Sequence, residues 1–182
     1  MTTSAASLRT LSHALDQAGD VLDHVHADVL SRPTPCQEWD VGALADHLVN
    51  DLQQFLVLMQ GGQPDWAAPA PHVAEGWGPA FRVAADDLIH LWHEVLGGHL
   101  PEPAQPPEWQ CAEIAVHTWD LATALGVPTS SLDPAVAEAG LGFMQGALTT
   151  ELRGGAFGPE QAAPESAEVY ARLAAFAGRS VA

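Results

Sequence analysis

Glu113 and His117 place a carboxylate and an imidazole four residues apart, the spacing that sets two side chains on one face of a helix. The same face carries Leu121 and Ala124, which indicates that it points into the core. Burying both polar groups costs several kcal/mol unless something pairs with them. Two pairings are open at this point: a direct hydrogen bond between the two side chains, and joint coordination of a metal ion.

His47 is a third side chain of this chemical type. It lies at the edge of the apolar stripe of another predicted helix, and facing helices of a bundle can bring such a residue against an i, i+4 pair. Two imidazoles and one carboxylate form a ligand set found in catalytic zinc sites, where a further position stays open to water or substrate. Nickel and ferrous iron accept the same ligands, so the donors alone leave the metal undecided.

Three neighbouring residues are candidates for roles around these donors. Asp51 follows His47 by one helical turn and is expected to line the pocket or orient a bound ligand. Asp120 follows His117 by three residues and is a candidate for the second hydrogen bond that a metal-bound imidazole usually makes. Trp39 precedes the start of its helix, where packing into the core and contact with a bound ligand are both open interpretations.

The two cysteines, Cys36 and Cys111, are far apart in the sequence, and neither belongs to a CxxC pair. A zinc knuckle and a thioredoxin-type site are therefore not indicated. Both cysteines are expected to be small, buried thiols. Cys36 lies beyond Trp39, and Cys111 lies roughly 160° around its helix from Glu113, so neither is expected to reach the metal.

These residues must be positioned by helices. Apolar residues at three- and four-residue spacing predict helices over 8–29, 40–59, 81–95, 108–125, 133–148 and 169–176. No segment shows the alternation of a half-buried strand. Four main helices with Pro- and Gly-rich connections predict an all-α fold, a four-helix bundle with additional C-terminal helices, in a single domain spanning 1–182. The connection after the second helix is long, which indicates a crossover.

Charge and hydropathy exclude some classes of partner. The formal charge is −17, with six arginines and no lysine, which opposes binding to phosphate backbones and anionic lipids. We therefore expect no nucleic acid and no membrane as partner. No apolar stretch approaches the roughly 20 residues of a membrane span, and the first residues lack a signal-peptide pattern, which indicates a cytoplasmic protein. The sequence leaves open whether the chain forms a homodimer.

Two segments resemble a known superfamily. Residues 34–48 contain Thr-Pro-Cys-Gln-Glu-Trp-Asp-Val and Leu-Ala-Asp-His-Leu, and residues 113–122 read Glu-Ile-Ala-Val-His-Thr-Trp-Asp-Leu-Ala. They resemble the signatures of the DinB-like superfamily, above all its mycothiol-dependent maleylpyruvate isomerase branch from actinobacteria, over essentially the whole chain. The resemblance implies an up-down-down-up four-helix bundle. It also implies a divalent metal, most simply zinc, held by His47, Glu113 and His117, and mycothiol as the low-molecular-weight thiol co-substrate.

The expected function is that of a metal- and thiol-dependent transferase or isomerase that acts on a small electrophile. The characterised isomerase of this family has an additional C-terminal domain that helps to form its active site, whereas a short segment follows the fourth predicted helix here. Isomerisation of maleylpyruvate itself is therefore not expected. Two alternatives stay open: a hydrolase in which metal-bound water replaces the thiol, and a non-catalytic metal-binding or stress-response protein.

Overall fold

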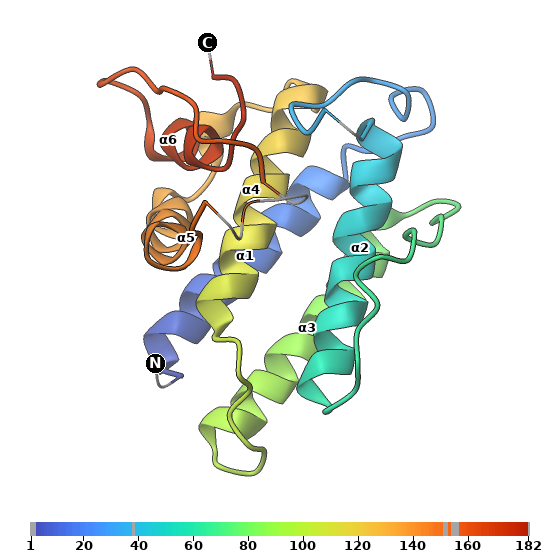
Figure 1. Cartoon of the computed structure of the whole chain (residues 1–182). Coiled ribbons are helices and arrows are strands. Elements are labelled where there is room, and N and C mark those ends of the chain that lie inside the picture. Colours follow the sequence, from blue (N-terminus) through green and yellow to red (C-terminus); the bar gives the residue numbers. More distant parts are fainter. Residues whose placement is uncertain (1–2, 38, 151–152, 154–156, 182) are drawn as a thin grey trace.

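The computed structural model describes residues 3–37, 39–150, 153 and 157–181 of the 182-residue chain. Four long helices form the bundle: α1 (Ala5–Leu22), α2 (Val41–Met59), α3 (Trp77–Leu96) and α4 (Pro107–Leu125). α1 packs against α3 and α4, and α2 completes the square by packing against the same two helices. The chain runs up α1, down α2, down α3 and up α4 (Figure 1). The expected all-α bundle of up-down-down-up type is thus confirmed.

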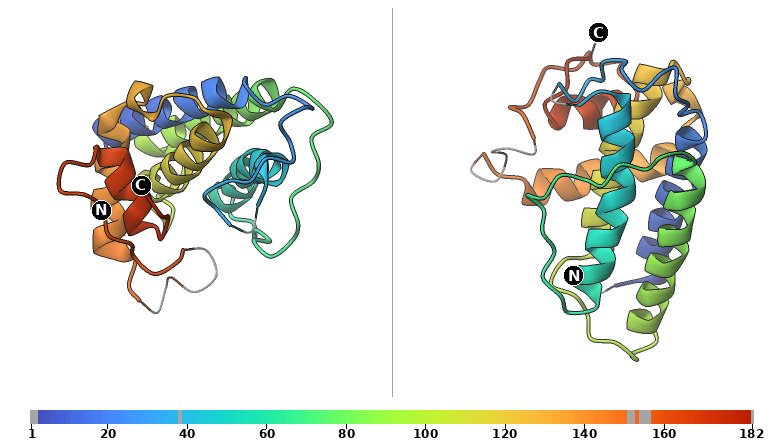
Figure 2. Two further views of the ribbon diagram at one scale, coloured as in Figure 1. Left: turned by 90° about the horizontal axis from the view of Figure 1, so that it is seen from above. Right: turned by 90° about the vertical axis from the view of Figure 1, so that its right-hand side faces the viewer.

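Two shorter helices follow the bundle, as predicted. α5 (Pro134–Ala147) crosses α4, and α6 (Val169–Phe176) packs against both (Figure 2). A short 3-10 turn, η1 (Thr129–Ser131), joins α4 to α5. Gly140 permits the close approach of α5 to α4, because a Cβ atom there would lie only 3.2 Å from Ala112 Cα. This packing brings the C-terminal segment against the rear of α4.

The helix ends follow from capping chemistry. Asp40 caps α2 by accepting a hydrogen bond from the Ala43 N–H at 2.9 Å, and Asp133 caps α5 in the same manner. α4 begins with Pro107 and ends at Leu125, and Gly126 caps its C-terminus with a φ of +74°. The start and stop signals in the sequence therefore coincide with the ends of these helices.

α1 is shorter than predicted, because it ends at Leu22 rather than near residue 29. After Leu22 the backbone continues in short turns, such as the one closed by Val25 N–H donating to Leu22 O at 3.0 Å. Val25 and Val29 are nevertheless buried. Their spacing therefore predicted burial correctly, while the continuation of the helix was wrong.

The long connection between α2 and α3, residues 60–76, is tied to α2 by one buried carboxylate. Asp46 accepts hydrogen bonds from His72 Nδ1 at 2.8 Å, from the Val73 N–H at 3.0 Å and from Trp77 Nε1 at 2.8 Å. These bonds fix the end of the connection, so that its middle lies beside the face that α2 turns toward α4.

The described part of the chain contains helices, turns and one isolated bridge between Pro33 and Asp40, without a β-strand. None of the helices in this part is long and apolar enough to cross a membrane.

Candidate metal centre

α2 and α4 run in opposite directions and carry matching rows of side chains toward the same space. The two rows, each at four-residue spacing, are His47, Asp51 and Phe55 on α2, and Trp109, Glu113 and His117 on α4. At one end the two imidazole rings are 4.9 Å apart, centroid to centroid, and at the other end the two aromatic rings are 5.1 Å apart. The carboxylates lie between these pairs. The α2 row therefore meets the α4 row in reverse order, as antiparallel helices require.

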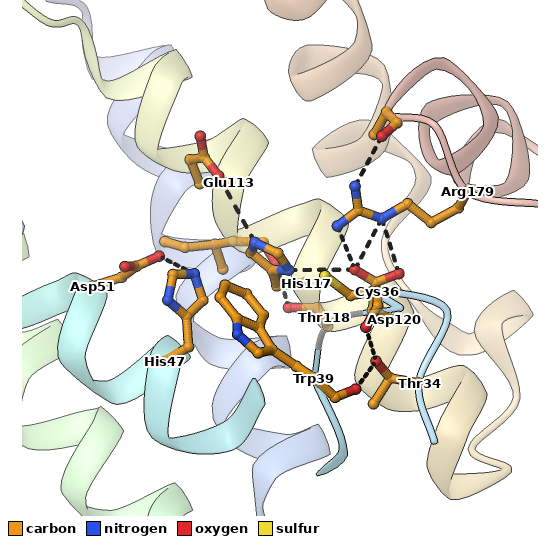
Figure 3. A network of polar contacts seen from close by, with 12 residues as sticks. Thr34, Cys36, Trp39, His47, Asp51, Glu113, His117, Thr118, Asp120 and Arg179 are labelled. Carbon is orange, nitrogen blue, oxygen red and sulfur yellow. Dashed lines mark hydrogen bonds and ion pairs between the residues drawn. The ribbon is translucent and has the colours of Figure 1, made fainter. Parts of the chain in front are cut away.

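The rear nitrogen of His117 is held by a buried acid. His117 Nδ1 lies 3.3 Å from Asp120 Oδ2, and the Asp120 side chain is fully buried (Figure 3). Because an ionised carboxylate only accepts hydrogen bonds, this contact places the ring proton on Nδ1. The lone pair of Nε2 is then available on the pocket side, 3.9 Å from Glu113 Oε2. The hydrogen bond expected for Asp120 is confirmed.

Arg179 keeps Asp120 ionised. Its Nε lies 3.2 Å from both carboxylate oxygens, and its terminal Nη2 lies 2.9 Å from Oδ2. Burial alone would raise the pKa of Asp120, but the hydrogen bonds from His117 and Arg179 outweigh burial and lower it. For His117, burial lowers the pKa most, and the nearby His47 lowers it further. The imidazole is therefore neutral, the form that can bind a metal.

His47 is held from two directions on the opposite wall. Its Nε2 lies 3.0 Å from Asp51 Oδ2, one turn along α2. The Trp39 ring stacks against it at a tilt, with centroids 4.1 Å apart, and also lies 5.6 Å from the His117 ring. Trp39 thus packs over both imidazoles and lines the pocket. The residue is therefore packed inside the protein and is also placed where it could contact a bound ligand.

Glu113 is placed where a proton or a cation must neutralise it. Burial, together with the charge of Asp51 nearby, raises the pKa of the Glu113 carboxyl to about 8. Without a metal the carboxyl is therefore largely protonated at neutral pH. A divalent cation would favour the carboxylate instead, as a ligand at this position requires.

A pocket of about 770 Å³ opens in front of these side chains. Its size lies within the range of small-molecule sites, roughly 300–1,000 Å³. α2 and α4 form two walls, and residues 66–70 of the connection after α2 form a third. Five of the site residues expected from the sequence line this one cavity, Trp39, His47, Asp51, Glu113 and His117, whereas Asp120 lies behind His117.

The donor types in this pocket suit a divalent metal, although among the described residues the donor atoms of His47, Glu113 and His117 do not all lie within 4.8 Å of one another. The 3.9 Å between His117 Nε2 and Glu113 Oε2 is about half an ångström more than the spacing of two ligands on a tetrahedral zinc ion, about 3.3–3.4 Å. A small side-chain rotation would close it. His47 Nε2 would exchange its contact with Asp51 for the metal, which leaves the Asp51 carboxylate beside the same position. Two imidazoles and one or two carboxylates suit zinc, nickel or ferrous iron.

A second group of donor atoms lies behind His117. Among the described residues, Cys36, His117 and Asp120 bring three such atoms within 4.8 Å of one another. This group is a poorer cation site, because Arg179 binds both oxygens of Asp120 and its positive charge would repel an added ion. The side of His117 that faces the pocket is therefore the better candidate.

The position of Cys36 corrects a prediction, because this residue lies at the site rather than beyond Trp39. Thr34 Oγ1 donates a hydrogen bond to Trp39 O at 2.7 Å, and the Trp39 N–H donates one to Cys36 O at 2.9 Å. This turn folds Cys36 back toward His117, so it lines the pocket. Cys111 faces away from the site as expected, and burial raises the pKa of its thiol to about 12.

Arg179 is the site residue that sequence reasoning missed. It is 4% exposed, although it follows the last helix near the end of the chain. Gly178 makes its placement possible, because a Cβ atom on Gly178 would lie 2.6 Å from Gly158 Cα and its φ is +91°. The Gly-Arg pair after an apolar helix was the available signal, but nothing in the spacing connects it to Asp120.

Comparisons with known proteins identify the family of the chain. A family model described as the mycothiol maleylpyruvate isomerase N-terminal domain matches residues 11–108, just over half of the chain, and includes His47. Two uncharacterized proteins of Mycobacterium tuberculosis, from strains CDC 1551/Oshkosh and H37Rv, are each 31% identical over 182 residues. Each alignment covers 92% of this chain and 94% of the relative. No solved structure matches the chain at comparable significance. The chain belongs to the mycothiol maleylpyruvate isomerase N-terminal domain family.

Proposed function

We propose that this protein is a metal- and thiol-dependent transferase or isomerase that acts on a small electrophile. His47, Glu113 and His117 hold a divalent metal, and mycothiol is the thiol. One observation carries the proposal: two imidazoles and a carboxylate converge from α2 and α4 on one pocket, in a chain of a mycothiol-related family. A bound divalent ion would lower the pKa of a coordinated thiol and so supply a thiolate at neutral pH.

The residues behind and beside the donors fit these roles. The Asp120 and Arg179 pair fixes the tautomer of His117 with its proton on Nδ1. The lone pair of Nε2 is therefore free to bind a metal on the pocket side. The Asp51 carboxylate lies 3.0 Å from His47 Nε2, and we assign it the role of accepting the proton of the thiol. Trp39 covers both imidazoles and limits the approach of water from its side.

The thiol and the electrophile are the only reactants that the proposed reaction needs. The thiol gives its proton to Asp51, and the sulfur forms a bond to the electrophilic carbon. In a transfer, the leaving group departs with the electron pair of the broken bond and takes up the proton. In an isomerisation, the sulfur adds to an activated double bond, the former double bond rotates, and expulsion of the thiolate restores the double bond in the other geometry.

Cobalt substitution tests the proposal. Cobalt–thiolate coordination gives an intense near-ultraviolet charge-transfer band, whereas nitrogen and oxygen ligands do not. Mycothiol added to the cobalt-loaded protein should produce this band, and S-methylated mycothiol, which cannot form a thiolate, should not. Glu113→Gln should lose both cobalt and band.

The matched control removes histidines that lie outside the pocket. His90 and His93 are exposed on α3, at a spacing that could bind metal weakly. The His90→Ala/His93→Ala variant should keep a full equivalent of cobalt and the full band. If an intact cobalt site shows no band at millimolar mycothiol, the thiol-dependent function is wrong.

A further inference from the structure

The end of the pocket far from the imidazoles is built from three aromatic rings. Phe55 of α2, Trp109 of α4 and Trp66 of the connection after α2 all line the pocket. Their ring centroids lie 5.6 Å (Phe55 to Trp66), 5.1 Å (Phe55 to Trp109) and 5.7 Å (Trp66 to Trp109) apart. We call these three residues the aromatic cluster. Trp66 remains 49% exposed, so one large apolar ring is left uncovered at the pocket wall.

The aromatic cluster lies within reach of the metal donors. α4 rises about 1.5 Å per residue, which places Trp109 about 6 Å from Glu113 and about 12 Å from His117 along the axis. A planar molecule of one or two rings that packs on the cluster therefore extends toward the carboxylates and the imidazoles. Its reactive atom would lie near the position where the thiol is proposed to bind.

The charge of the pocket selects against anions. Three acidic residues line it, Asp46, Asp51 and Glu113, and Glu113 is a carboxylate when a cation is bound. All six arginines of the chain are among the described residues, and none lines the pocket, while the sequence has no lysine. Arg179 binds Asp120 on the far side of His117 (Figure 3). An anionic group at the aromatic end would lose its hydration without gaining a positive partner.

We propose, resting on the proposed function, that the electrophile is an uncharged, flat apolar or aromatic molecule that packs on Phe55, Trp66 and Trp109. Dicarboxylates are poor ligands for this pocket. A metal ion could accept one carboxylate, but a second would face the acidic walls and the aromatic cluster.

Calorimetric titration of the purified protein, with its metal content measured alongside, tests this selectivity. The probes are 2-naphthylmethanol and naphthalene-2-sulfonate, which share one ring system and differ in charge; sulfonates are weak metal ligands. The alcohol should bind at least tenfold more tightly than the sulfonate. Added salt should reduce this difference in affinity, because it screens the repulsion between the sulfonate and the acidic side chains. Equal affinities, or tighter binding of the sulfonate, would overturn the proposal.

Variants locate the binding position. Trp66→Ala should weaken binding of 2-naphthylmethanol at least tenfold, and this exposed position allows the variant to fold. Val83→Ala is the matched control, because Val83 is an exposed apolar residue on α3 that does not line the pocket. It should bind like the wild type. Unchanged affinity in Trp66→Ala would show that the ligand does not use the aromatic cluster.

Failure of this inference can be told apart from failure of the proposed function. A cobalt–thiolate band with no preference for the neutral probe would leave the function standing and remove the selectivity. Preference for the neutral probe without the band would support an apolar ligand site and refute thiol dependence.

Discussion

Replacing Arg179 with Met should strongly destabilise the protein, because it breaks a buried ion pair from one side. Arg179 is 4% exposed and Asp120 is fully buried, and Arg179 also donates to Ala177 O at 2.8 Å. Removing one partner of such a pair costs about 3–5 kcal/mol, since the remaining charge is buried without compensation. With a urea m-value of about 2 kcal/mol per M, the unfolding midpoint should fall by roughly 1.5–2.5 M.

The assay is urea unfolding of four proteins: wild type, Arg179→Met, Asp120→Asn and the double variant. The double variant should be more stable than the sum of the two single losses predicts, because it buries no unpaired charge. Arg172→Met is the matched control, an exposed arginine on α6, and should stay within about 0.5 kcal/mol of the wild type.

The advantage of the wild type over Arg179→Met should also depend on pH. The pKa of Asp120 is lowered in the folded protein relative to its ordinary value of 3.8. A lowered acid pKa stabilises the fold above the unfolded pKa, and this contribution is lost as the pH falls through the folded pKa. The difference should therefore be full at pH 7 and shrink below pH 3.8. A loss under about 1 kcal/mol at pH 7, or a difference that grows in acid, would refute the role of this pair.

Three further predictions follow from other parts of the fold. Asp46→Ala leaves the buried Trp77 Nε1 without its acceptor and should lower the free energy of unfolding by at least about 1–3 kcal/mol, measured in urea; an unchanged midpoint would refute this anchor. In the Cys36→Ser background, Cys111 should not react with a disulfide reagent at pH 8 in the native state and should react once unfolded, because its pKa is about 12; rapid native labelling would contradict its burial. Gly178→Ala should cost about 1–3 kcal/mol from its φ of +91° alone, and a wild-type thermal midpoint would show that the backbone there can relax.

Periodicity predicted most of the fold because amphipathic helices carry their own signal. The boundaries of α2, α4 and α5 lie within a residue or so of those predicted, since Asp40, Gly126 and Asp133 are local signals. The end of α1 was misplaced because Val25 and Val29 keep helical spacing while the backbone turns. A pattern of burial cannot distinguish a helix from a turn that buries the same side chains.

The convergence of the site residues was partly predictable. Four-residue spacing put Glu113 and His117 on one face, and the facing helix supplied His47. The positions of Cys36 and Arg179 depend on a turn and on a contact between two glycines, and neither leaves a periodic signal. That the three donors bind a metal, and that the chain forms one domain, stay predictions.

The aromatic cluster shows a different limit of the sequence. Phe55 and Trp109 continue the rows of His47 and of His117. In the sequence, apolar residues at this spacing predict only that they are buried in the core. Their distinction comes from Trp66, which an irregular connection brings against them. Contacts made by loops between distant segments are set by tertiary packing, so they appear only in the structure.

Metal analysis of three proteins tests the central claim most directly. Untagged wild type, His47→Ala and Cys36→Ser are dialysed against dilute chelator, and bound divalent metal is measured per chain. His117 belongs to both candidate donor groups, whereas His47 belongs only to the group with Glu113, and Cys36, although it also lines the pocket, belongs only to the group with Asp120. We expect about one metal ion per chain in the wild type and in Cys36→Ser, and a steep loss in His47→Ala. Full metal in His47→Ala together with loss in Cys36→Ser would contradict the assignment of the pocket as the metal centre.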